Sequence, residues 1–403
     1  MKKKTMLMEL NKQECCGCGT CVLVCPQRAI TMSCGELGSL YPQINAEQCI
    51  ACGLCERNCA YLQKESDREN GPIRAFAASM TDKETLRRSA SGGVAAALSQ
   101  TFVEKGGAVV GCALVYVNEE LVPKHICVDE LSDLWKLQGS KYVQSNLGEI
   151  FEQIKSRLGE GHRILFFGTP CQVDALRHYL RHTDTTNLFL VDLVCHGVPS
   201  AKLFGDYLKT LKGQVLSFSF RDKVFGWGLT ASYTYLDRNG RIKKCILSPN
   251  VSSYYTYFLN GEIYRESCYS CKYANISRVG DLTIGDFWGI EQEHPEYLQE
   301  NGGSLSAREG ISALMVNNSH GAELLAVHGG DLETIESAPD RVAKWNRQLC
   351  SPSKHSAVCE ELKRVYSVKG YVGIEKLFRK RLGLRYVVRR FKAKIFALRK
   401  CDL

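Results

Sequence analysis

Long apolar runs are missing from this sequence of 403 residues. No uninterrupted apolar stretch approaches the roughly 20 residues that a membrane-spanning helix requires. The N-terminal lysines are not followed by the apolar core of a secretory signal, because Glu9, Asn11 and Lys12 interrupt that region. Twenty cysteines would suggest disulfides in a secreted protein, but without such a signal we expect reduced thiols. The sequence predicts a cytoplasmic protein, or one that is peripheral at the inner membrane face.

Acidic residues are scarce at the end of the chain. Residues 370–403 hold eleven Lys or Arg against Glu375 and Asp402, so this basic amphipathic tail alone carries the whole net charge of +9. The first 369 residues are balanced, and any argument for an anionic partner therefore rests on the tail. Apolar side chains recur there at helical spacing: Ile374, Leu377, Phe378, Leu382, Val387, Val388, Phe391, Ile395 and Leu398.

Such a tail could lie on an anionic membrane surface or against an acidic partner. It could equally be a terminal helix that packs on its own domain and leaves its basic face in water. Nucleic acid is not expected as a partner, because no recognised nucleic-acid-binding fold accompanies the charge.

Cysteine is abundant, and much of it is patterned. Residues 15–25 and 49–59 each contain a C-x2-C-x2-C-x3-C run. In such a run three thiolates wrap one corner of an iron–sulfur cube, while the fourth points away to the other cube. The runs therefore predict two [4Fe–4S] clusters, the first held by Cys15, Cys18, Cys21 and Cys59 and the second by Cys25, Cys49, Cys52 and Cys55.

Residues 9–62 resemble the two-cluster bacterial ferredoxins, although only the first run keeps a proline after its fourth cysteine. The alternative is a zinc site, because two C-x2-C knuckles can hold one tetrahedral zinc. Eight cysteines in two tripled runs exceed what one zinc needs. Cys16 and Cys34 are left over, and we expect them to be plain small side chains near the clusters and not ligands.

The middle of the chain alternates strands with helices. Residues 63–72 are polar, end in Gly-Pro and predict a linker. Short apolar strands are predicted at 163–167 and 187–194, and each leads through a loop with one cysteine into a helix. This order implies parallel βα units, whose sites lie beyond the carboxyl ends of the strands. Further strands are predicted at 73–80, 108–117 and 311–316, and helices at 173–180, 201–211, 251–259 and 322–327.

An antiparallel region is expected next to these units. Residues 215–220 and 229–236 look like strands, and Asn239-Gly240 is a strong tight-turn signal for a hairpin.

Two stretches could contact a cofactor. Ser91, Gly92 and Gly93 precede a helix-forming segment, where free backbone N–H groups could bind a phosphate. Serine is also the ordinary helix cap, so this signal is weak by itself. Lys141 lies in a dense polar stretch and could neutralise a cofactor phosphate, or it could be a solvated loop lysine.

Four cysteines outside the ferredoxin-like unit could form a third centre. Two of them follow neighbouring strands and two form a C-x2-C pair: Cys171, Cys195, Cys268 and Cys271. Spacing alone leaves open a zinc ion, a third [4Fe–4S] cluster or buried unpaired thiols.

Residues 72–318 resemble the family of coenzyme F420 hydrogenase/dehydrogenase beta subunits. The resemblance is carried, in order, by the segments 91–93, 138–143, 168–172, 195–199, 268–271 and 285–289. It implies a flavoprotein that holds FAD beside an iron–sulfur cluster. It makes Cys171, Cys195, Cys268 and Cys271 the expected ligands of a third [4Fe–4S] cluster. The flavin-pocket residues that it implies are Ser91, Gly92, Gly93, Lys141, Thr169, Pro170 and Gln172.

The electron count suggests a function. Iron–sulfur clusters pass single electrons, whereas many organic substrates accept two electrons as a hydride. A flavin can connect one-electron transfer with two-electron transfer. We expect an oxidoreductase that moves electrons from a ferredoxin or flavodoxin through the clusters to FAD and on to a small-molecule acceptor, such as coenzyme F420 or another reducible metabolite. His196 could donate the proton, or it could be a hydrogen-bonding group beside a ligand cysteine. The alternative is a non-catalytic subunit that relays electrons to a partner protein.

The expected fold is an α+β multidomain protein. A small two-cluster ferredoxin-like domain (1–62) and a linker (63–72) precede a mixed α/β flavin- and iron–sulfur-binding domain (73–330), which has parallel βα units and an antiparallel hairpin region. A C-terminal extension (331–369) and the basic amphipathic tail (370–403) follow.

Overall fold

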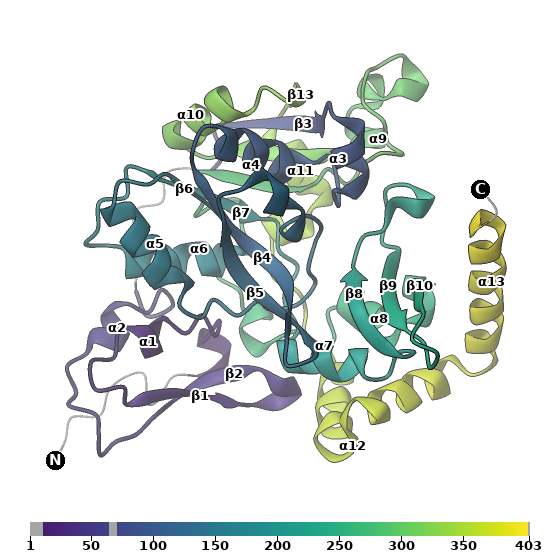
Figure 1. Cartoon of the computed structure of the whole chain (residues 1–403), viewed down its shortest axis with the longest axis horizontal. Coiled ribbons are helices and arrows are strands. Elements are labelled where there is room, and N and C mark those ends of the chain that lie inside the picture. Colours follow the sequence, from purple (N-terminus) through teal and green to yellow (C-terminus); the bar gives the residue numbers. More distant parts are fainter. Residues whose placement is uncertain (1–10, 64–70, 402–403) are drawn as a thin grey trace.

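The computed structural model describes residues 11–63 and 71–401. Three sheets organise this part of the chain: a two-stranded sheet in the N-terminal unit, a large eight-stranded sheet and a separate three-stranded sheet. In Figure 1 the N-terminal unit lies at one end of the large sheet, and the three-stranded sheet lies beside it. The expectation of a mixed α/β protein with an N-terminal ferredoxin-like unit is confirmed.

The N-terminal unit is built twice on the same plan. A short helix, α1 (Thr20–Leu23) or α2 (Leu54–Arg57), follows the first two cysteines of each run, and the antiparallel strands β1 (Ile30–Cys34) and β2 (Leu40–Ile44) join the two halves. Side chains of the large domain hold the unit in place. Lys272 Nζ donates to the Ala60 carbonyl at 2.6 Å, and Ser200 Oγ donates to the Leu37 carbonyl at 2.5 Å.

The large sheet has the strand order β13-β3-β12-β11-β7-β6-β4-β5. Its centre is parallel, because β4 pairs with β6, β6 with β7 and β7 with β11 in that sense, while the flanking pairs are antiparallel. The strands are β3 (Arg74–Met80), β4 (Ala108–Val117), β5 (Glu120–Val128), β6 (Ile164–Gly168), β7 (Leu188–Leu193), β11 (Leu282–Asp286), β12 (Ser312–Val316) and β13 (Leu332–Ser337).

Helices cover both faces of this sheet, which is why its central strands are nearly continuous apolar runs. One face packs on α4 (Val94–Glu104) and α10 (Ser319–His328), and the other on α5 (Ile150–Gly159) and α6 (Pro170–Tyr179). Side chains alternate along β3, where Phe76 and Ala78 face one core and Ala75 and Ala77 face another. That second core includes α11 (Pro339–Trp345) and α9 (Ile290–Glu293), and α3 (Lys83–Arg88) follows β3.

The three-stranded sheet packs on an aromatic core. Its strands β8 (Gln214–Ser219), β9 (Ala231–Leu236) and β10 (Ile242–Leu247) are antiparallel, and Asn239-Gly240 lies in the β9–β10 turn as predicted. The helices α7 (Ala201–Leu208), α8 (Ser253–Leu259) and α12 (Ala357–Leu382) contribute to this core. It buries Phe204, Tyr207, Phe218, Phe220, Tyr254, Tyr255 and Tyr371.

The basic tail divides into two parts that behave differently. Helix α12 bends at Gly370, where φ is +56°, and then buries Ile374 and Phe378 in the aromatic core. Helix α13 (Leu384–Cys401) follows at the outer side of the three-stranded sheet in Figure 1, and its Tyr386 packs on the aromatic core. The first half of the tail is therefore a terminal helix on its own domain, although Val372 is exposed, and the second half presents a row of exposed apolar side chains: Leu384, Val387, Val388 and Phe391.

Most predicted strands and helices are found within a few residues of their expected ends. The parallel βα units at β6–α6 and β7–α7 are confirmed. The pairing of β13 with β3 places residues 332–337 in the large sheet, beyond the domain end expected at residue 330. Most of the predicted linker, residues 64–70, lies outside the described residues. No helix within residues 11–63 and 71–401 has the length and hydropathy needed to cross a membrane.

One buried ion pair fastens the centre of the large sheet. The fully buried Asp192 of β7 accepts from Arg278 Nη2 at 2.6 Å, from the Gly280 N–H at 2.8 Å and from Thr283 Oγ1 at 2.8 Å. We predict that Arg278→Met lowers the free energy of unfolding by about 3–5 kcal/mol, because it leaves a buried carboxylate without its cation.

Urea unfolding followed by circular dichroism measures this effect. The matched control is Glu336→Gln, which breaks the exposed Arg74–Glu336 pair and is expected to leave the unfolding midpoint almost unchanged. Equal midpoints for wild type and Arg278→Met would contradict the prediction.

Candidate functional site

The two cysteine runs of the N-terminal unit share one backbone conformation. Gly17 and Gly19 have φ of +67° and +80°, and the equivalent Ala51 and Gly53 have φ of +53° and +71°. Left-handed residues between cysteines turn backbone N–H groups inward, and the Ala51 N–H approaches Cys49 Sγ at 3.4 Å. The Ala29 N–H likewise donates to Cys25 Sγ at 3.3 Å. Hydrogen bonds to sulfur are a usual means of tuning iron–sulfur clusters.

The fourth cysteine of the second run lies with the first run. Burial, together with the neighbouring Cys18 and Cys15 thiols, raises the pKa of Cys59 to about 11. Burial also raises the pKa of Cys21, to which the Cys18, Cys15 and Cys59 thiols contribute. Cys15, Cys18, Cys21 and Cys59 are therefore neighbours, which is the placement that the predicted exchange of fourth ligands requires.

The four cysteines outside this unit also come together. Burial raises the pKa of Cys195 well above its usual range, and the Cys268, Cys171 and Cys271 thiols raise it further. Cys195 follows β7, Cys171 lies in the first turn of α6, and the other two belong to one loop. The parallel βα order explains the meeting of the first two, because β6 and β7 are neighbours and end at the same edge.

This donor set fits a thiolate-bound centre. Sulfur donors suit zinc and iron–sulfur clusters, and a bound metal would offset the repulsion among four buried thiolates. Within residues 11–63 and 71–401, no three histidine, cysteine or acidic side chains converge tightly enough to hold a single metal ion.

Cys16 joins the two regions, which the sequence did not indicate. It is buried, and its thiol interacts with the Cys171 thiol of the third group and the Cys18 thiol of the first run, which raises the pKa of Cys16 well above its usual range. The hydrogen bond from Cys16 lowers the pKa of Cys18 to about 6. The first predicted cluster therefore faces the third group, whereas Cys52 of the second run is exposed.

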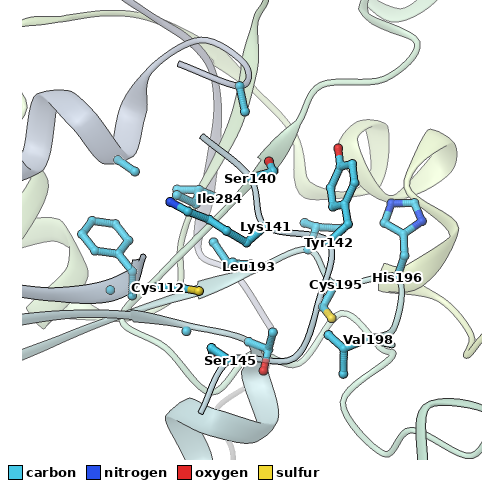
Figure 2. Close-up of a pocket in the computed structure, with 18 of the residues that line it drawn as sticks. Cys112, Ser140, Lys141, Tyr142, Ser145, Leu193, Cys195, His196, Val198 and Ile284 are labelled. Atoms are coloured by element: carbon cyan, nitrogen blue, oxygen red, sulfur yellow. The ribbon is translucent and has the colours of Figure 1, made fainter. Parts of the chain in front are cut away.

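A cavity of about 710 Å³ opens next to the third group. Figure 2 shows two of the segments that line it, 140–145 and 193–198, with Cys195 and His196 in the second. The lining includes all the predicted third-centre cysteines and these predicted flavin or catalytic residues: Ser91, Gly93, Lys141, Thr169, Pro170, Gln172 and His196.

The loop before α4 is pinned to β12. Ser91 Oγ donates to the Ile311 carbonyl at 3.0 Å, and the Gly92 N–H donates to Ser312 Oγ at 2.9 Å. Gly92 does not line the cavity, and a Cβ there would lie 2.1 Å from the Ala78 carbonyl oxygen, so this glycine serves close packing and not the predicted contact with a cofactor. Gly93, with φ of +79°, begins α4, whose N-terminus has no side-chain cap. The first residues of this helix, Val94, Ala95 and Ala96, line the cavity, so their uncapped N–H groups are the place there where an anion could bind.

Lys141 is neither a solvated lysine nor a free phosphate ligand. Its Nζ donates to the Leu137 carbonyl at 2.8 Å and to the Gln138 carbonyl at 2.9 Å. Burial lowers its pKa to about 8. Its donors thus hold the 136–141 loop, and it acts on the cavity through charge.

Thr169, Pro170 and Gln172 form the start of α6. Gln172 Oε1 accepts from the Thr169 N–H at 3.0 Å in a capping box, and Pro170 takes the first helical position. Gln172 Nε2 donates to Ser145 Oγ at 2.9 Å, which ties this turn to the opposite wall of the cavity. Thr169 Oγ1 lies 3.2 Å from Cys171 Sγ. These residues therefore fix the position of one predicted ligand.

His196 lies at the open side of the cavity with an exposed side chain. Partial desolvation by the surrounding protein atoms lowers its pKa below the usual value. A neutral imidazole presents one donor and one acceptor, so at neutral pH this residue suits hydrogen bonding better than service as a charged acid.

His125 on β5 is a cavity residue that sequence reasoning missed. It is 2% exposed, and its Nε2 donates to the Phe167 carbonyl at 3.0 Å, which leaves Nδ1 as an acceptor with no partner within the described chain. Burial lowers its pKa to about 4. An unused acceptor at a cavity wall is a place for a ligand N–H or O–H.

A polar cluster lies behind the part of the cavity wall that Asp286 and Trp288 line. Asp286 accepts from Arg221 Nη1 at 2.9 Å and from Trp227 Nε1 at 2.7 Å, and Trp227 stacks on Trp288 with ring centres 4.8 Å apart. The sequence marked Asp286 and Trp288 only as parts of a motif. The structure gives them a supporting role beside the cavity.

The cavity fits a flavin cofactor in size and chemistry. Cofactor sites usually span 300–1,000 Å³ and combine apolar walls with a few polar groups. Here the free N–H groups of α4 suit a phosphate, and the bare His125 Nδ1 suits a ring N–H.

Three family models match the chain. Two of them describe the N-terminal and C-terminal parts of the coenzyme F420 hydrogenase/dehydrogenase beta subunit, and they cover residues 75–152 and 161–339. The third, a 4Fe–4S dicluster domain, covers residues 14–62. Together the first two match more than half of the chain.

Two individual proteins are also similar. A component of the F(420)H(2) dehydrogenase of Methanosarcina mazei is 26% identical over 228 residues, which cover 52% of this chain. The match spans 63% of that relative's own length, which is less than two thirds. A chain of the F420-reducing NiFe hydrogenase complex from Methanosarcina barkeri is 17% identical, with a TM-score of 0.44 over 77% of this chain and 97% of that chain.

The family models follow the order of the segments on which the resemblance rests, and the iron–sulfur model covers the two cysteine runs. The chain belongs to the family of coenzyme F420 hydrogenase/dehydrogenase beta subunits and carries a 4Fe–4S dicluster domain at its N-terminus.

Proposed function

We propose that this chain is an FAD- and iron–sulfur-dependent oxidoreductase. It takes electrons from a ferredoxin- or flavodoxin-type donor, carries them on three [4Fe–4S] clusters and delivers them through FAD to a small-molecule acceptor. The observation that carries the proposal is that the two cysteine regions meet at Cys16, on the wall of the cavity that fits a flavin. The two cysteine regions and the cavity are thus contiguous, which supports one continuous path for electrons.

The protein supplies position and surroundings. Cys171, Cys195, Cys268 and Cys271 would hold the third cluster, and the amides at the start of α4 would bind a phosphate of FAD. Thr169 and Gln172 fix Cys171, and His125 would accept a hydrogen bond from the cofactor. When bound, FAD supplies the change between one-electron and two-electron transfer.

The open side of the cavity favours an enzyme over a simple relay. His196 is exposed there and can hydrogen-bond to an acceptor that lies in the cavity mouth. The name of the Methanosarcina mazei relative makes coenzyme F420 the first acceptor to test. A non-catalytic subunit that relays electrons to a protein partner is the second candidate, because that relative is named as one component of a larger dehydrogenase.

We further propose that α13 rests on an anionic membrane surface at the inner face. Leu384, Val387, Val388 and Phe391 are each more than half exposed and share one helical face by their spacing. Arg385, Arg389, Arg390 and Lys392 are exposed among them, and no acidic residue occurs between 376 and 401. A basic amphipathic helix of this kind suits a headgroup layer.

Cofactor content tests the proposed function. Protein purified without oxygen should contain about twelve iron atoms and one FAD per chain, since each [4Fe–4S] cluster holds about four irons. Cys268→Ser should lower the iron to about eight, whereas the exposed Cys34→Ser should leave it at the wild-type value. About eight irons and no flavin in the wild type would contradict the proposal.

Stability against pH tests the placement of His125. The pKa of His125 is about 4 in the folded chain and about 6.5 in the unfolded chain. Between these pH values the unfolded chain binds an extra proton, so the free energy of unfolding falls as the pH decreases through that window. Over this window we predict that acidification lowers the free energy of unfolding of His125→Phe by about 1.4 kcal/mol less per pH unit than that of wild type. Urea unfolding at pH 5 and pH 7 measures it, with the exposed His182→Gln as control. The same acid sensitivity in His125→Phe and wild type would show that His125 is not held neutral.

Vesicle co-sedimentation tests the membrane surface. The full chain should bind phosphatidylserine vesicles at low salt and be released at high salt, because the attraction is screened. Replacing Arg385, Arg389 and Arg390 by Gln should abolish binding, while Val387→Ser with Phe391→Ser should weaken it. Equal binding to neutral phosphatidylcholine vesicles, or none to either, would contradict the assignment.

A further inference from the structure

Arg265 is a buried cation between the two cysteine regions. It is 2% exposed and lies three residues before Cys268. Its Nε donates to the Cys15 carbonyl at 2.9 Å, its Nη2 to the Leu40 carbonyl at 2.7 Å and its Nη1 to Gln144 Oε1 at 2.8 Å. The guanidinium thus reaches from the loop of the third group into the first cysteine run.

No acidic side chain balances this charge within residues 11–63 and 71–401. The adjacent Glu266 pairs instead with Lys363 at 2.6 Å. Carbonyl oxygens satisfy the N–H groups of Arg265 but carry no net charge, and an uncompensated buried cation is costly. A compensating negative charge is therefore expected close by.

The cysteines around Arg265 are the natural source of that charge. Cys15 Sγ lies 4.0 Å from Nη2, and the arginine also acts electrostatically on Cys18, Cys171 and Cys268. Four thiolates give an iron–sulfur cluster net negative charge, which increases when the cluster is reduced. A cation here would stabilise the reduced form of the cluster nearest to it.

The duplicated cysteine runs differ at the point where Arg265 packs. A Cβ on Gly17 would lie 2.4 Å from Nη1, so the first run admits the guanidinium only because this residue is glycine. The equivalent position in the second run is Ala51, which is exposed. Within the described structure no buried arginine packs against it. The arginine therefore distinguishes two otherwise similar cluster-binding loops.

We propose that Arg265 raises the reduction potential of the first cluster, held by Cys15, Cys18, Cys21 and Cys59, above that of the second. This inference rests on the proposed clusters. A single electron that arrives at the second cluster, next to the exposed Cys52, is then drawn to the first and so toward the third cluster and the cavity. Arg265 is a positioning residue, since it acts through the clusters and touches no acceptor.

Potentiometric titration followed by electron paramagnetic resonance tests this on the full chain purified without oxygen. Arg265→Gln should keep the wild-type iron content and move the midpoint potential of one cluster to a more negative value, while the others stay within error. Arg265→Lys keeps the charge and should restore part of the shift. The matched control is Arg57→Gln, which removes an exposed arginine that donates to the Cys52 carbonyl at 3.0 Å and should change the potentials far less.

A second variant covers the case in which Arg265→Gln does not fold or load iron. Gln144→Glu keeps the arginine and the side-chain shape but places a carboxylate against Nη1, so the same cluster should again become harder to reduce. If Arg265→Gln keeps its full iron content and its midpoint potentials are unchanged, the role of Arg265 is overturned but the proposed function is not. If Arg265→Gln does not fold or load iron, the same result in Gln144→Glu overturns that role. A wild-type protein without iron would overturn both this role and the proposed function.

Discussion

The packing of the N-terminal unit on the large domain brings buried thiols from both together at Cys16, and the proposed electron path depends on that contact. The Cys16 thiol lies against one cysteine from each side, and Arg265 crosses the same boundary with two hydrogen bonds, to the Cys15 and Leu40 carbonyls. Burial and the neighbouring thiols hold the pKa of Cys16 well above its usual range, so it is a neutral thiol in the metal-free chain, whereas the thiolates that bind a cluster need the compensating charge of its iron. The contact between the domains and the binding of clusters are therefore expected to be linked.

The large sheet explains why the site lies where it does. Parallel neighbours β6 and β7 end at one edge, and the turns beyond them deliver Cys171 and Cys195 to the same place. The start of α4 and the 136–145 loop also line the cavity at this edge. Short capping interactions, such as the Thr169–Gln172 pair, then fix the positions of side chains. Motif spacing in the sequence does not predict these positions.

The sequence was sufficient where a local pattern has one structural solution. The spacing within residues 15–25 and 49–59 indicated the two cysteine runs, and continuous apolar segments indicated β6 and β7 with their helices. Strand β5 carries alternating burial and no distinct local signal, so His125 could not be recognised as a wall of the cavity. Arg265 and Cys16 were missed for a related reason, because their partners lie far away in the chain and each residue type is common.

Two other features show how packing overrides a local interpretation. Gly92 was expected at a cofactor, but the close approach of β3 and β12 uses it instead. The tail has one continuous basic amphipathic pattern, but the bend at Gly370 allows its first half to pack on the aromatic core. Neither outcome follows from periodicity, since both depend on which surface the segment finally contacts.

The most direct test of a contiguous electron path is a crystal structure of the anaerobic protein with anomalous diffraction at the iron absorption edge. The account predicts three iron sites, two within the N-terminal unit and one among Cys171, Cys195, Cys268 and Cys271, with flavin density in the adjoining cavity. Iron confined to the N-terminal unit, with zinc or no metal at the third group and no flavin density, would contradict it.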